Sequence, residues 1–99
     1  MNSRQDILRF LASNKKYLEE HYSISKIGLF GSYARNEATP QSDIDIIIEL
    51  KEGTKSVYSL KNALREYLSR HLKKPVDLAR EKYLKPYARE AILRDTLYV

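Results

Sequence analysis

Cysteine is absent from the 99 residues of this chain. Without thiols the chain can form neither disulfides nor thiolate-ligated metal sites, so we expect it to work in a reducing cytoplasm. Long apolar segments are absent as well. The longest mainly apolar stretch, residues 44–48, is interrupted by Asp45 and is far too short to span a bilayer. The amphipathic beginning of the chain does not have the apolar core of a signal peptide, and we expect none.

Glycine and proline are scarce, at three residues each. The sequence has no internal repeat, low-complexity stretch or linker. Hydrophobic residues make up 42% and charged residues 31%, which is ordinary for a soluble globular protein. We therefore expect one small domain over residues 1–99, with little room for a separate substrate-recognition domain.

Positive charge is concentrated in the second half of the chain. Residues 1–50 carry 6 basic and 7 acidic side chains, whereas residues 51–99 carry 12 and 6. A basic half would attract nucleotides or nucleic acid, although the helical spacing of the basic and apolar residues favours ordinary solvated helix faces. No aromatic-rich RNA-binding motif accompanies the basic residues, so we expect contact with nucleic acid to be weak or indirect.

Hydrophobic periodicity predicts four helices that alternate with three strands. The helices are expected over residues 3–22, 33–35, 56–72 and 86–95, and the strands over residues 24–30, 43–50 and 76–79. Asn2 or Ser3 is expected to cap the first helix, and Ser32 the second. The order α-β-α-β-α-β-α predicts an α/β fold in which helices cover a short sheet.

Two expectations concern packing rather than chemistry. The last helix should turn inward the apolar residues Leu84, Ala88, Ala91 and Ile92. The histidines, His21 and His71, fall in or beside helical stripes, so they are expected to pack against neighbours rather than bind ligands.

Two aspartates open the second expected strand, in the sequence Asp43-Ile44-Asp45. Because side chains alternate along a strand, Asp43 and Asp45 share one face while Ile44 points to the other. Neighbouring carboxylates repel each other and cost desolvation free energy, so the pair indicates a bound cation. The alternative is a pair of acids that simply face water. A calcium loop is not expected, since the glycine and later glutamate of an EF-hand are absent.

A third aspartate, Asp77, falls in the third expected strand. If that strand lies beside the second, Asp43, Asp45 and Asp77 converge into a carboxylate site. Such a site suits hard divalent cations, and Mg²⁺ is the usual choice when phosphates complete its coordination. Taken alone, Asp77 has a stronger alternative explanation, as a single acid that faces water.

Gly31 and Ser32 stand where the first strand turns into a helix, a place where free backbone N–H groups can hold an anion. The pair matches neither the dinucleotide-binding fingerprint nor the Walker A loop. Arg35 would reach a phosphate or would be a surface cation at a helix end. Ser42 would donate a hydrogen bond to a phosphate or would only shape its loop. A metal site beside a phosphate site is typical of nucleotide chemistry.

The order of these elements and motifs closely resembles the nucleotidyltransferase superfamily typified by DNA polymerase beta. The matching residues are Gly31-Ser32, the pair Asp43 and Asp45, and the later acid Asp77. The motif Gly-Ser-Tyr-Ala-Arg, followed by Ser-Asp-Ile-Asp, is similar to that of the minimal nucleotidyltransferases of prokaryotes. The resemblance covers nearly the whole chain. One departure is Asn36, where the family usually has glycine; asparagine is the next most tolerant residue at a helix end with positive φ.

The resemblance implies a small mixed sheet covered by helices and a Mg²⁺–nucleotide site that holds two ions. Asp43 and Asp45 would be metal ligands, Asp77 a third ligand and the base, and Gly31 and Ser32 would bind the triphosphate of ATP.

Family members of this kind are often antitoxins encoded beside a HEPN-domain ribonuclease toxin, and they transfer AMP from ATP to a tyrosine of that toxin. The expected function is therefore protein adenylylation, in a hetero-oligomer with the toxin. Two alternatives remain open at this point. One is a non-catalytic antitoxin that neutralises its partner by binding, and the other is nucleotide transfer to RNA or to a small molecule.

Overall fold

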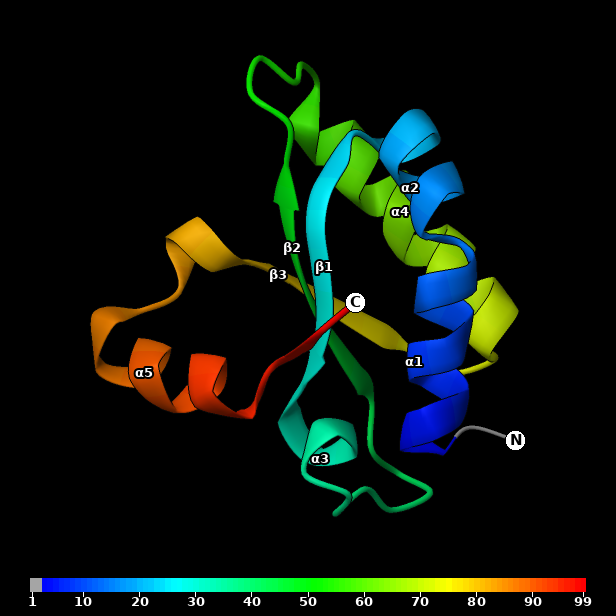
Figure 1. Ribbon diagram of the computed structural model, residues 1–99, viewed down its shortest axis with the longest axis vertical. Coiled ribbons are helices and arrows are strands. Elements are labelled where there is room, and N and C mark those ends of the chain that lie inside the picture. Colours follow the sequence, from blue (N-terminus) through cyan, green and yellow to red (C-terminus); the bar gives the residue numbers. More distant parts are fainter. Residues whose placement is uncertain (1–2) are drawn as a thin grey trace.

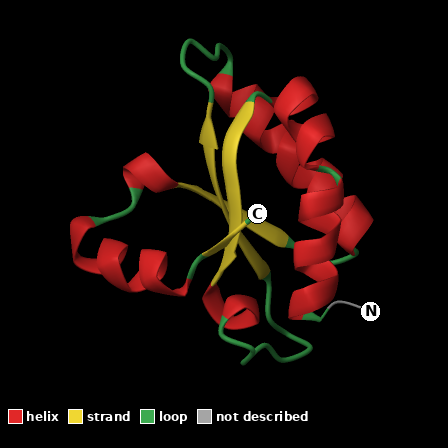
Figure 2. Cartoon of the chain, in the orientation of Figure 1, coloured by secondary structure: helices red, strands yellow, loops and turns green. Residues whose placement is uncertain are grey.

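The computed structural model describes residues 3–99, so Asn2 lies outside the described residues. The elements in chain order are α1 (Arg4–Ser13), α2 (Lys15–Tyr22), β1 (Ile24–Phe30), α3 (Gly31–Ala34), β2 (Ile44–Leu50), α4 (Val57–Leu72), β3 (Val76–Arg80), the 3₁₀ turn η1 (Glu81–Tyr83), α5 (Pro86–Asp95) and β4 (Leu97–Tyr98) (Figures 1 and 2). Ser3 caps α1 as expected. Its hydroxyl accepts from the N–H of Asp6 at 3.1 Å, and the Asp6 carboxylate accepts from the N–H of Ser3 at 3.2 Å.

Within the described residues the strands form one mixed sheet in the order β3-β2-β1-β4. β2 pairs with β3 in parallel, whereas β1 runs antiparallel to both β2 and β4. This confirms the mixed α/β fold. Strand β4 was not predicted, because its two residues are too short a run to show a periodic pattern.

The expected first helix over residues 3–22 is two helices, and the prediction of a continuous helix was wrong. The chain breaks at Asn14, which ends α1 and begins α2. The Asn14 side-chain amide donates to the carbonyl of Phe10 at 2.9 Å. A side chain that bonds the backbone in this way competes with the regular helical hydrogen bonds, which explains the break.

The two faces of the sheet differ in character. Ile44, Ile46 and Ile48 of β2 are almost fully buried and belong to the main core, which also takes in Ile7 and Leu64 from the helices. Figure 1 shows α1, α2 and α4 together on one side of the sheet. Alternation along β2 places Asp45 and Ile47 on the opposite face, on the side where α5 lies.

Helix α5 does not bury its apolar side chains as predicted. Every residue from 86 to 95 lies in the described part of the chain, and none of them is buried. Ala91 is exposed, whereas Leu84, Ala88 and Ile92 are only partly buried. The reason is that α5 packs apart from the other long helices, and no further layer covers it (Figure 1).

The two histidines pack by stacking at the surface. His21 stacks on Tyr17 with ring centroids 4.0 Å apart, and His71 lies against Tyr67 at 4.2 Å. Both histidines are exposed, so they contribute to an aromatic cluster on α2 and α4 and not to the core.

Polar contacts of Glu81 fasten the C-terminal elements to the sheet. Its carboxylate accepts from the Tyr98 hydroxyl at 2.7 Å and from the Lys26 ammonium at 3.4 Å, and its carbonyl accepts from Arg89 at 2.7 Å. These bonds join η1, β1, α5 and β4. The hydrogen bond from Tyr98 is the main reason that the pKa of Glu81 is lowered, while burial and then this bond raise the pKa of Tyr98 to about 12.

We expect Tyr98→Phe to lower the free energy of unfolding by about 1 kcal/mol, because it removes a hydrogen bond to a charged acceptor. Urea denaturation at pH 7 measures this difference. Tyr87→Phe is the matched control, since Tyr87 is 86% exposed and its loss of a hydroxyl should leave the midpoint unchanged. Equal midpoints for Tyr98→Phe and the wild type would contradict the role of Glu81.

The same variant has a defined pH dependence. The pKa of Glu81 is lower in the folded chain than its ordinary value of 4.5, so its contribution to stability is fully present above pH 4.5. The contribution is lost as the pH falls through the folded pKa. The difference between Tyr98→Phe and the wild type should therefore shrink in acid.

Candidate active site

The register of the parallel pair β2–β3 places Asp45 directly opposite Asp77. Partner residues on neighbouring strands point to the same face, and the strands lie about 4.8 Å apart. Asp43 is exposed and directly precedes β2, which begins at Ile44, one residue later than predicted. The backbone therefore brings the three predicted acids to one corner of the sheet, with Asp77 also exposed.

Asp45 is the most perturbed of these acids. Burial raises its pKa first, and the charges of Asp77 and then Asp43 raise it further, while Arg35 has a smaller opposing effect. In residues 3–99, however, no three histidine or acidic side chains lie close enough together to hold one metal ion. The three carboxylates thus interact through their charges without sharing a common centre.

Gly31 is in direct contact with the carboxylate of Asp45. Its φ is +75°, a conformation that residues with a Cβ rarely adopt, and a Cβ there would collide with Asp45 Oδ2. Helix α3 begins at Gly31 and its N-cap is Phe30, so Ser32 lies in the first turn and is not the predicted cap. The sharp turn at Gly31 starts the helix earlier than the sequence indicated.

Asn36 adopts the positive φ expected for it, at 63°. Its N–H donates to the carbonyl of Tyr33 at 3.1 Å and ends the short helix. Asparagine therefore fills the position where the resembled family has glycine, and the backbone keeps the left-handed turn.

Arg35 and Ser42 are both engaged within the protein. The Arg35 guanidinium donates to Glu37 at 3.0 Å and lies 3.6 Å from Asp95 of α5. The hydrogen bond to Glu37 is the main reason that the pKa of Arg35 is raised. The Ser42 hydroxyl accepts from the N–H of Thr39 at 2.9 Å, which supports its role in shaping the loop.

Two acids near the site were missed by sequence reasoning. Glu49 shares the face of Asp45 on β2, and it accepts from Arg80 at 3.1 Å and from the N–H of Lys82 at 2.7 Å. Burial raises the pKa of Glu49, but these hydrogen bonds outweigh it and the net pKa is lowered. Period-2 alternation would have found Glu49. The Asp95 partner of Arg35 lies 60 residues away in sequence, and no local pattern signals it.

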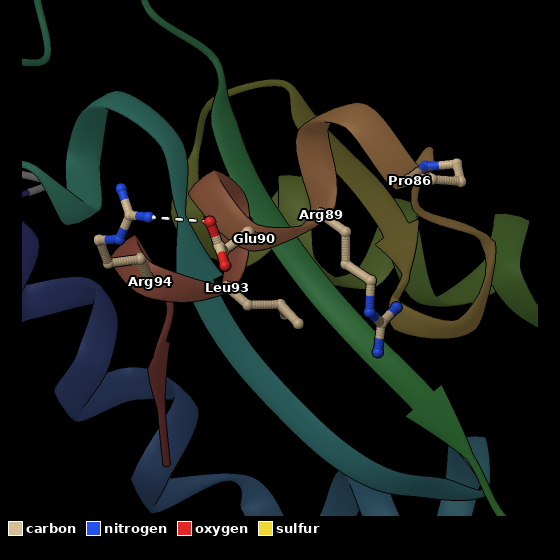
Figure 3. Close-up of a pocket in the computed structure, with 5 residues that line it drawn as sticks. All are labelled: Pro86, Arg89, Glu90, Leu93 and Arg94. Atoms are coloured by element: carbon tan, nitrogen blue, oxygen red, sulfur yellow. Dashed lines mark hydrogen bonds and ion pairs between the residues drawn. The ribbon is translucent and has the colours of Figure 1, made fainter.

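Two hollows flank α5. A pocket of about 90 Å³ between α3 and α5 is lined by Phe30, Gly31, Arg35, Ala91, Ile92 and Asp95. A larger and more open one of about 620 Å³ is lined by Pro86, Arg89, Glu90, Leu93 and Arg94, where Arg94 pairs with Glu90 at 3.4 Å (Figure 3). The smaller pocket adjoins the Gly31 bend, whereas the larger one is formed by α5 residues and holds none of the predicted site residues.

Residues 11–99 match the family described as nucleotidyltransferase domain. The chain belongs to this family. It is 40% identical to a "putative protein adenylyltransferase" of Methanocaldococcus jannaschii and 35% identical to the protein adenylyltransferase MntA of Thermococcus cleftensis. The alignments cover this whole chain and 100% and 98% of those relatives. The nucleotidyltransferase assignment made from the sequence is therefore confirmed.

Solved structures share the fold. A structure described as a "putative minimal nucleotidyltransferase" superposes with a TM-score of 0.78 at 28% identity, covering 97% of this chain and 95% of that one. A crystal structure of a toxin–antitoxin with AMP-PNP gives a TM-score of 0.66 at 21% identity, covering 98% of this chain and 72% of that one. At that identity the second likeness shows the fold alone. No helix in the described residues is long and apolar enough to cross a membrane.

Asp45→Asn should stabilise the protein in the absence of ligands, because it removes a half-buried charge that two neighbouring acids repel. We expect the melting temperature at pH 7 to rise by a few degrees, since ~1 kcal/mol corresponds to about 4–8 °C for a chain of this size. Thermal unfolding followed by circular dichroism measures it. Asp43→Asn is the control, and its exposed carboxylate should give a smaller rise. A fall in melting temperature for Asp45→Asn would contradict the electrostatic description.

Gly31→Ala and Gly53→Ala form a matched pair. Both glycines have positive φ, at +75° and +80°, but a Cβ at Gly53 would meet no described heavy atom within 4 Å. Gly53→Ala should cost about 1–2 kcal/mol from the backbone alone. Gly31→Ala should cost about 1–3 kcal/mol more, because its methyl group also displaces Asp45. Equal costs in urea denaturation would show that the contact with Asp45 is unimportant.

Proposed function

We propose that this nucleotidyltransferase is a Mg²⁺-dependent protein adenylyltransferase, and that it transfers AMP from ATP to a tyrosine of a HEPN-domain ribonuclease toxin. In this role it is the antitoxin of the pair. The observation that carries the proposal is the contact of Asp45 with Gly31, opposite Asp77. It joins the two halves of the predicted site, the bend and the carboxylates. The names of the two relatives support protein as the acceptor, and the toxin–antitoxin structure with AMP-PNP supports ATP and a toxin partner.

Asp43, Asp45 and Asp77 suit a magnesium site by their chemistry. They offer only carboxylate oxygens, the ligands that Mg²⁺ prefers, and a cation would relieve the repulsion that raises the pKa of Asp45. The three carboxylates do not converge on one centre in residues 3–99, so their side chains would have to rotate to other rotamers to hold a shared ion. Bound Mg²⁺, as two ions, would neutralise charge on the triphosphate and on the departing pyrophosphate.

The protein residues then have separate tasks. The backbone N–H groups at Gly31 and Ser32 would hold the triphosphate, with Arg35 and Ser42 as further donors. Asp77, which is exposed, would take the proton of the acceptor hydroxyl as the tyrosine oxygen attacks the α-phosphorus. Pyrophosphate leaves, and the toxin gains a bulky anion on its tyrosine. An added negative charge in a ribonuclease active site would repel RNA.

Neutralisation by binding alone is the second candidate function. It is favoured by exposed aromatic residues on two helices, Tyr58 on α4 and Tyr87 on α5, which are 81% and 86% exposed. A purely binding antitoxin does not require the costly arrangement of Asp45 beside Asp77, and for this reason we place catalysis first.

Labelled ATP, Mg²⁺ and the HEPN-domain ribonuclease proposed as the partner form the test. We expect label on the toxin, lost when its acceptor tyrosine is changed to phenylalanine and when EDTA removes the metal. Asp45→Asn and Asp77→Asn should each reduce transfer by about 100-fold or more, because each removes a ligand or the base. Glu49→Gln is the matched control, since it removes an acid from the same strand and face outside the site, and it should keep transfer.

Two results would overturn the proposal. One is transfer by Asp45→Asn at the wild-type rate. The other is the absence of label under conditions in which the wild-type protein still inhibits the ribonuclease, which would establish neutralisation by binding.

A further inference from the structure

The segment between β3 and α5 presents an exposed tyrosine among cations. Tyr83 of η1 is 68% exposed. The guanidinium carbon of Arg80 lies 5.0 Å from the centroid of its ring, and the Lys82 ammonium lies 5.5 Å from it. Figure 1 places η1 on the side of the sheet away from α1, α2 and α4. Tyr83 is thus accessible, with exposed Lys82 beside its ring, whereas the charge of Arg80 is paired with Glu49 at 3.1 Å.

The other tyrosines of the chain are less suited to react. Tyr33 is buried, and Tyr22 and Tyr67 are partly buried in the aromatic cluster with Tyr17. Tyr98 donates its hydroxyl to Glu81, and its pKa is raised to about 12. Tyr58 and Tyr87 are exposed, but in residues 3–99 no cation lies over either ring.

We propose that this protein adenylylates a second copy of itself on Tyr83. This inference rests on the proposed function, since it uses the same nucleotide site and the same acceptor chemistry. The Tyr83 oxygen of one copy attacks the α-phosphorus of ATP bound to the other copy. The bond from the α-phosphorus to pyrophosphate breaks, pyrophosphate leaves, and the phenolic proton passes to Asp77 of the copy that holds ATP. Tyr83 is left with AMP as a phosphodiester.

Geometry requires a second copy. Asp77 and Arg80 lie three residues apart along extended β3, which separates them by about 10 Å, and Tyr83 lies beyond that strand end. The tyrosine therefore cannot reach the carboxylates of its own chain without unfolding the end of the strand.

Charge favours the encounter between copies. A site that holds ATP combines three aspartates with an anionic triphosphate, whereas Tyr83 approaches it together with the exposed cation Lys82. Opposite charges on two surfaces steer association and fix orientation. Lys82 stabilises negative charge on the attacking oxygen and on the phosphodiester that forms.

A mixing experiment separates donor from acceptor. Tyr83→Phe serves as the active donor, and a copy of different length that carries Asp45→Asn serves as the inactive acceptor. With labelled ATP and Mg²⁺ we expect label on the Asp45→Asn copy, located on Tyr83 by peptide mass spectrometry. Initial labelling of the wild-type protein alone should rise with the square of its concentration. Tyr83→Phe should fold normally, as checked by its melting curve, and should still label the toxin.

Matched acceptors make the result decisive. Asp45→Asn with Tyr83→Phe should lose the label, whereas Asp45→Asn with Tyr58→Phe or Tyr87→Phe should keep it. Equal labelling of these acceptors, or label on the toxin but none on this chain, would overturn the inference and leave the proposed function intact. The absence of label from both proteins would overturn the two together.

Discussion

The crowding of Asp45 is the constraint on which the rest of the site depends. Its carboxylate lies against Gly31, opposite Asp77 and close to Asp43, and burial, followed by repulsion from these two acids, raises its pKa. An arrangement with this cost persists only where surrounding structure holds it. Here the parallel register of β2 and β3 holds it from one side and the left-handed turn at Gly31 from the other. A glycine and an aspartate fourteen residues apart thus act as one unit.

Residues on the opposite face of β2 contribute stability that offsets the cost of placing Asp45 beside other acids. Ile44, Ile46 and Ile48 are almost fully buried against the layer of α1, α2 and α4. Burial of each such side chain contributes about 1.5–3 kcal/mol. Because alternate residues of β2 serve the core and the site, the polar side chains are carried on a strand whose position the core fixes. The seven residues of β2 therefore contribute both to the core and to the site, which explains how so short a chain holds several charged groups in place.

Much of this could be predicted from the sequence, because the signals were local. Alternation of aspartate and isoleucine separated Asp45 from the buried Ile44 and Ile46, and positive φ at Asn36 followed from its place after a short helix. The errors arose where structure depends on distant partners. Asn14 breaks a helix through a side-chain bond, which periodicity does not register. Helix α5 has an apolar stripe like a core helix, yet the sequence does not tell which stripes will be covered.

The predictions for individual site residues divide in the same way. The neighbourhood of Asp45 and Asp77 followed from assuming that the third strand lies beside the second, which it does, whereas their parallel direction was not predicted. The pairing of Arg35 with Asp95 could not be predicted, since it joins elements that no local pattern relates. The alternation of residues along β2 already puts Glu49 on the same face as Asp45. The sequence does not show, however, that Glu49 accepts a hydrogen bond from Arg80, whereas the structure does.

The polar contacts that hold α5 against the sheet have a consequence for local motion of the chain. None of the ten residues of α5 is buried, and the polar contacts of Glu81 and Asp95 hold it in place. Segments with little buried apolar surface open locally at a small fraction of the free energy of global unfolding. Backbone amides of 86–95 should therefore exchange with solvent well before those of β2. Such opening would uncover the hollow that α5 shares with Gly31 and Arg35 while the isoleucine core stays intact, so a bulky protein acceptor could approach without global unfolding.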